Sequence, residues 1–299
     1  MDAVSLLQVT SAFLLNVGFT WLVGTWFARH WLRSNGSRGN DIASGMRRLD
    51  LAAAGLTAAS SAIALLAATA VMGDVGLRDA CPMFWMMLTS TDYGHAGSIT
   101  IVAMLALLLI RGLGGAGRGS DIGAALALAL FAFTRASMGH AGENGLLSAT
   151  LAAEAIHYAA IGLWSGAVIV SAWLVLNEAQ ISMADIGAHD RYLDLMSQAA
   201  MAAVIAIFAT GLYSAWHRVG TADHLWHTFY GMTLLLKVAL VLVAIALGGY
   251  NKFLGLPAAQ CSARGLRLVR AALRIESVVL LGAVLAASVL TSQPPPAAM

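Results

Sequence analysis

The sequence predicts an all-α integral membrane protein with eight transmembrane helices. Hydrophobic residues make up 59% of the 299-residue chain and charged residues only 11%, which is less than half the charge of a typical soluble domain. Eight apolar stretches reach or approach the length that spans a bilayer. They contain no proline and lack the two-residue alternation of β-strands, so we expect each to be a helix.

The expected spans follow one another along the whole chain. The first, Val4–Phe27, has no basic segment before it and no small-residue cleavage site, so we expect a true span and not a removable signal peptide. The others are Leu49–Met72, Tyr93–Ile110, Ile122–Ser137, Leu151–Leu176, Met196–Tyr213, Phe229–Tyr250 and Leu273–Leu290.

The basic residues predict the orientation. One side of the predicted bundle holds only Arg78, Arg135 and Arg218, whereas the other holds thirteen: Arg29, Arg33, Arg38, Arg47, Arg48, Arg111, Arg118, Arg191, Lys252, Arg264, Arg267, Arg270 and Arg274. By the positive-inside rule the richer side is cytoplasmic, so both termini are expected to be periplasmic. Cys81 and Cys261 then lie on opposite faces, too far apart for an intramolecular disulfide. The net charge of +2 gives no reason to expect a nucleic-acid partner.

Short internal similarities divide the chain into two halves. RRLDL (Arg47–Leu51) corresponds to RYLDL (Arg191–Leu195), and TDYG (Thr91–Gly94) corresponds to TFYG (Thr228–Gly231). Four spans in each half predict two parallel four-helix repeats, related by an axis along the membrane normal. We place the halves at residues 1–140 and 141–299, together forming one membrane domain.

Soft metal ligands gather on the predicted outer side. They are Cys81, Met83, Met86, His95, Met138 and His140. Thiolate, thioether and imidazole form the ligand set that suits Cu(I). Each member also has a structural interpretation, because methionines fill helix packing and Cys81 precedes Pro82 in an expected loop. Their gathering on one face favours copper binding.

An ionisable pair lies inside the fifth span. Glu154 and His157 share one helical face, three residues apart. Ionisable groups at that depth are costly unless they face a cavity or a partner. A short connection is expected to bring His140 over the mouth above them. The sequence therefore predicts that Glu154, His157 and His140 bind metal, with a hydrogen-bonded structural histidine as the alternative for His157.

Other residues in the spans are expected to hold neighbouring helices. Gly162 and Gly166 have the spacing that lets another helix approach closely. Lys237 lies at a depth similar to that of His157 and is expected to pair with Glu154, either as a structural ion pair or as a gate that metal displaces. Glu276 is expected to pair with Lys252 or a neighbouring arginine.

The sequence contains no recognisable catalytic motif. The match to GxGxxG at Gly112–Gly117 lies in a predicted connector and not in a βαβ unit, and there is no Walker A or HExxH motif. We therefore expect a protein that is not an enzyme.

Several motifs resemble the copper resistance protein D family. GHA (Gly139–Ala141) followed by HYAAIGLWSG (His157–Gly166) is similar to its signature, although Ser165 and Ala167 depart from the WxGG pattern. TFYGMTLLLKVALVL (Thr228–Leu242), YNK, RIES and the proline-rich end extend the similarity. The resemblance implies an inner-membrane copper protein that works with a periplasmic copper carrier, and it matches positions His140, His157, Trp164 and Lys237.

We therefore expect a multi-pass protein of the bacterial inner membrane. It would accept copper, with Cu(I) favoured, from a periplasmic copper-binding chaperone and pass it into or across the membrane. Two alternatives remain: a b-type haem membrane cytochrome for electron transfer, which needs paired axial histidines, and a docking subunit for the chaperone that does not transport.

Overall fold

The computed structural model describes residues 3–32, 36–113, 117–139, 141–142, 145–177, 186–219 and 223–293. These residues form helices and a few turns, and none of them forms a β-strand. The long helices of the first half are α1 (Ala3–Leu32), α2 (Gly36–Met72), α4 (Asp92–Leu113) and α5 (Arg118–Ser137). Those of the second half are α6 (Ala149–Val170), α8 (Ile186–Val219), α10 (Phe229–Tyr250) and α12 (Ala263–Leu290).

Eight helical segments of the described chain are long and apolar enough to cross a membrane. They are Ala3–Leu32, Ser44–Met72, Asp92–Leu113, Arg118–Ser137, Ala149–Val175, Arg191–Trp216, Phe229–Cys261 and Ala263–Leu290. Each overlaps one expected span, so the all-α class and the eight spans are confirmed. The last two are longer than expected because polar residues interrupt the apolar runs there without ending the helices.

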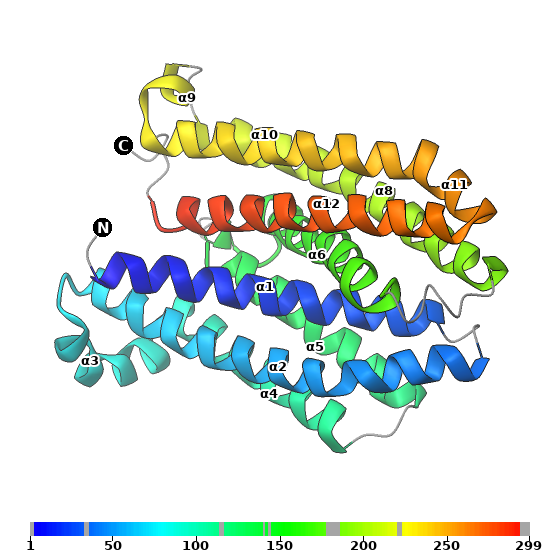
Figure 1. Ribbon diagram of the computed structural model, residues 1–299. Coiled ribbons are helices and arrows are strands. Elements are labelled where there is room, and N and C mark those ends of the chain that lie inside the picture. Colours follow the sequence, from blue (N-terminus) through cyan, green and yellow to red (C-terminus); the bar gives the residue numbers. More distant parts are fainter. Residues whose placement is uncertain are drawn as a thin grey trace.

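The eight long helices lie side by side in one bundle (Figure 1). α1 begins and α12 ends at the same end of the bundle, where the short helices α3 (Leu77–Ser90) and α9 (Asp223–His227) also lie. α11 (Leu256–Cys261) lies at the opposite end. We call the end that carries α3 and α9 the terminal end; its assignment to the periplasm stays a prediction.

The expected loop at Cys81 is helical, so that prediction was wrong. Cys81 and Pro82 lie within α3, which begins after Gly76. Pro82 is in the second turn, where the missing N–H removes an intrahelical hydrogen bond without ending the helix. The helix packs against α2 and α4.

Two hydrophobic clusters share helix α1. One joins α1 to α2, α4 and α5 around Phe19, Met104 and Phe131. The other joins α1 to α6, α8, α10 and α12 and includes Trp164 and Leu193. α1 therefore packs against both halves of the chain. The parallel repeat and the boundary after residue 140 stay predictions.

Glycines bring α1 and α6 into backbone contact. A Cβ on Gly166 would overlap the carbonyl oxygen of Thr20 and the backbone of Gly24, and a Cβ on Gly162 would lie 2.8 Å from Cε1 of Phe19. The expected close approach at Gly162 and Gly166 is therefore confirmed, and α1 is the neighbouring helix.

Candidate metal site

A polar pair on α6 faces a polar pair on α8. Nδ1 of His157 lies 2.9 Å from Oγ1 of Thr210, and Oγ of Ser214 donates a hydrogen bond of 3.3 Å to Oε2 of Glu154. Each pair is spaced by about one helical turn, so the two pairs meet along the interface of the two helices. His157 is eight residues from the start of α6, or about 12 Å along the helix axis.

The hydroxyl of Thr210 determines which nitrogen of His157 carries the proton. Thr210 Oγ1 donates its single hydrogen to the carbonyl oxygen of Ala206, at 2.6 Å. With its hydrogen directed to that carbonyl, Thr210 accepts a hydrogen bond from His157, and this arrangement assigns the imidazole proton to Nδ1 and a lone pair to Nε2. Metal-binding histidines are commonly held through their other nitrogen in this way. Nε2 is thus the atom suited to bind a metal ion.

The soft ligands expected on the outer side lie on three elements at the terminal end of the bundle. Cys81 and Met86 on α3 are exposed, whereas Met83 is partly buried. His95, in the first turn of α4, has Nε2 3.1 Å from the carbonyl oxygen of Thr89. Met138 ends α5, and its sulfur lies 3.8 Å from Nη1 of Arg135. His140 lies outside the described residues.

The described part of the chain does not bring these residues into one closed metal site. It contains no group of three or more His, Cys, Asp or Glu that could hold a metal ion. α3 packs on α2 and α4, whereas α6 packs against α8 and α1. The arrangement is a set of exposed and partly buried sulfur and imidazole side chains at the terminal end and a separate histidine–carboxylate pair deeper in the bundle.

Sequence reasoning missed two groups near this pair. The first consists of Thr210 and Ser214, whose hydroxyls lie one turn apart in an apolar span; that spacing was the available signal. The second is Arg135, which is only 9% exposed. Its guanidinium carbon lies 5.9 Å from the ring centroid of Tyr158, next to His157.

Partners were also expected for Glu276 and Lys237, and the structure tests the first of these expectations. Glu276 Oε1 accepts a hydrogen bond of 3.0 Å from Nε1 of Trp164. Lys252 instead has Nζ 3.2 Å from the sulfur of Met201, so the expected pairing of Glu276 with a basic residue was wrong. An indole N–H can satisfy one oxygen of a buried carboxyl in place of an opposite charge. The pairing of Lys237 with Glu154 stays a prediction.

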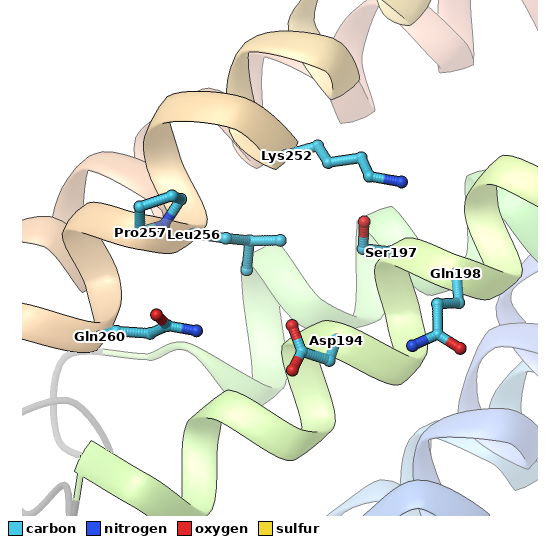
Figure 2. A pocket seen from close by; sticks show the side chains of 7 residues that line it. All are labelled: Asp194, Ser197, Gln198, Lys252, Leu256, Pro257 and Gln260. Carbon is cyan, nitrogen blue, oxygen red and sulfur yellow. The ribbon is translucent and has the colours of Figure 1, made fainter.

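A pocket of about 280 Å³ lies at the opposite end of the bundle. It opens between α8 and the segment formed by the π-helical turn η4 (Asn251–Gly255) and α11. Figure 2 shows Lys252 reaching across it above Asp194 and Ser197, with Gln198 and Gln260 at its sides. Its lining contains an ammonium group and no imidazole or sulfur, so it does not suit a soft metal ion.

The fold and these groups define a multi-pass membrane protein with sulfur and imidazole side chains at one end. Comparison with family models specifies the family. Residues 1–149 match the model described as copper resistance protein D-like, N-terminal domain, and residues 188–290 match the model described as copper resistance protein D. The chain therefore belongs to the copper resistance protein D family, as its motifs suggested, and has a role in copper resistance or homeostasis. Searches among curated proteins and among solved structures found no match.

Proposed function

We propose that this protein accepts copper at the terminal end of the bundle and passes it into or across the membrane. The observation that carries the proposal is the contact between Nδ1 of His157 and Thr210. This contact leaves the lone pair of His157 on Nε2, inside a membrane-spanning helix. The family's role in copper resistance supports copper as the metal ion that this lone pair would bind.

The first contacts would be the soft ligands at the terminal end. Cys81 and Met86 are exposed, so a periplasmic copper-binding chaperone can reach them. Further imidazole and thioether ligands at the terminal end would come from His95, Met138, Met83 and His140. Cu(I) is favoured as the transferred ion because sulfur and imidazole bind it well.

The second stage would place copper on His157. A cation inside the membrane needs compensating negative charge. Glu154 lies one turn from His157 on the same helix, toward the terminal end, and it supplies a carboxylate at that depth. The chain would act in the bacterial inner membrane and would catalyse no reaction, with transport passive or driven by an ion gradient.

The test is Cu(I) entry into proteoliposomes that contain an entrapped copper indicator, under anaerobic conditions. The wild-type protein should admit copper, and His157→Ala should lose most of this flux. His30→Ala is the matched control. His30 lies in the last turn of α1, far from the terminal end of the bundle, and stacks on Trp26. The copper flux of this variant should stay normal. Copper binding without flux would support the docking-subunit alternative, and split haem bands in the reduced absorption spectrum would support the cytochrome alternative.

A further inference from the structure

We propose that Glu276, Asn251 and Trp164 form a proton-binding site in the interior of the bundle, separate from the copper ligands. Glu276 lies in the middle of α12 and is 1% exposed. Trp164 on α6 is 3% exposed and donates its indole hydrogen to Oε1 of Glu276. A Cβ on Gly248 would lie 3.4 Å from the same oxygen, so α10 closes the third side.

The second oxygen of the carboxyl has no hydrogen-bond partner among the described residues. Oε2 of Glu276 is buried, and so are both amide atoms of Asn251, which also lack partners in this part of the chain. The Asn251 side chain approaches the Glu276 carboxyl without reaching hydrogen-bond geometry. Three buried polar atoms without partners among the described residues therefore belong to two side chains on elements that pack together, η4 and α12.

An amide beside a carboxyl can serve both of its protonation states. Oδ1 of Asn251 can accept a hydrogen bond from the protonated carboxyl, and after rotation of the amide Nδ2 can donate one to the carboxylate. A proton is the ligand that fits, because the three side chains supply one carboxyl, one amide and one indole N–H and neither sulfur nor imidazole for a soft metal ion.

Two charged groups on the neighbouring elements are directed elsewhere. The guanidinium of Arg274 on α12 stacks on Trp173, 4.5 Å from its ring centroid. Lys252, next to Asn251, lies against Met201. α6 and the π-helical turn η3 (Ser171–Val175) contribute the indoles of Trp164 and Trp173, and Trp173 donates to Ser277 at 3.2 Å. An isolated buried carboxylate is costly, and binding a proton removes that cost.

Two π-helical turns flank this region. Both η3 and η4 pack against α12, and η4 contains Asn251 itself. Such turns are rare and occur frequently at functional sites. Because two such turns pack against the helix that carries Glu276, they are a second and independent indication of a functional site.

The site has a consequence for transport that rests on the proposed function. α6 carries both His157 and Trp164, two turns or about 10 Å apart. Entry of one Cu(I) can be balanced by release of one proton from Glu276, whose carboxyl becomes a carboxylate. Copper entry would then be exchanged for a proton moving in the opposite direction.

The direct test is infrared difference spectroscopy of the metal-free, full-length protein in nanodiscs during a change of pH. We expect a carboxylic-acid C=O band that is lost in Glu276→Gln and retained in Glu154→Gln. Trp164→Phe and Asn251→Leu should shift the band without removing it, since they change only its hydrogen bonds. Melting temperatures of the variants check that each remains folded. A band that persists unchanged in folded Glu276→Gln would overturn the proposal.

A second measurement tests the coupling separately. In proteoliposomes, an acidic lumen should accelerate Cu(I) entry for the wild-type protein, and Glu276→Gln should lose this acceleration. Because the infrared experiment contains no copper, its result does not depend on whether the protein transports. An acceleration that survives in Glu276→Gln would overturn the exchange of copper for a proton.

Discussion

At the residue scale, the candidate site depends on one hydroxyl. Thr210 gives its hydrogen to the helix backbone and accepts one from His157, so it both orients the ring and selects the tautomer. Thr210 is a positioning residue, because it acts on copper only through His157. Gly211 beside it lies against the edge of the same ring, since a Cβ there would be 3.5 Å from Cε1 of His157.

Thr210→Val should weaken copper binding while preserving the fold. Valine has nearly the same shape but cannot accept a hydrogen bond, so the His157 proton is no longer held on Nδ1. Loss of such an outer partner typically lowers metal affinity about 10–100-fold. Thr210→Ser keeps the hydroxyl and should bind almost as the wild type does. Anaerobic Cu(I) titration against a competing chelator measures both, and equal affinities for the two variants would contradict this role.

The sequence predicted this site only in part. Glu154 and His157 were identifiable because ionisable groups stand out within an apolar span. Thr210 and Ser214 were missed because hydroxyl residues occur throughout transmembrane helices by bonding to their own backbone. The contact of Trp164 with Glu276 joins residues 112 positions apart, so no local pattern reveals it.

At the element scale, the contact of α1 with α6 holds the two halves of the chain together. Gly24 on α1 and Gly166 on α6 place the two backbones against each other. Without a hydrophobic driving force between helices in lipid, close packing of this kind is a main source of association. This contact was predictable from the spacing of Gly162 and Gly166, but its partner helix was not.

Gly166→Ala should destabilise the protein. The added methyl group meets backbone atoms of α1, which cannot rotate away as a side chain would, so the helices must separate. Overpacking of this kind typically costs about 1–3 kcal/mol. Gly249→Ala on α10 is the control, because a Cβ there meets no atom within 4 Å. Thermal unfolding in one detergent compares the variants, and equal melting temperatures would refute the account of this contact.

The spans were predicted well because hydropathy and length report directly on the membrane. α3 was missed because a Cys-Pro pair commonly marks a helix boundary, whereas here Pro82 is accommodated one turn inside the helix. Packing against α2 and α4 outweighs the single lost hydrogen bond. The helix at Cys81 was therefore not predicted because it depends on tertiary contacts, which a local sequence pattern does not reveal.

At the scale of the whole molecule, the account requires that the terminal end face the periplasm. The chain carries one native probe for each face. Cys81 is exposed on α3 at the terminal end, and Cys261 is exposed at the end of α11, at the opposite end of the bundle (Figure 1).

A membrane-impermeant maleimide applied to intact spheroplasts should label Cys81 and not Cys261. Labelling should therefore disappear in Cys81→Ser and remain in Cys261→Ser. After the membrane is permeabilised, Cys261 should react as well, which confirms that its thiol is reachable. The reverse pattern in intact spheroplasts would invert the orientation and move the soft ligands to the cytoplasm.

X-ray absorption spectroscopy of the Cu(I)-loaded protein tests the central claim most directly. We expect imidazole nitrogen together with sulfur around copper in the wild type. His157→Ala should lose a nitrogen scatterer and part of the bound copper, while His30→Ala should match the wild type in both. A copper spectrum and stoichiometry that are unchanged in folded His157→Ala would contradict the assignment of His157 as the copper ligand inside the membrane.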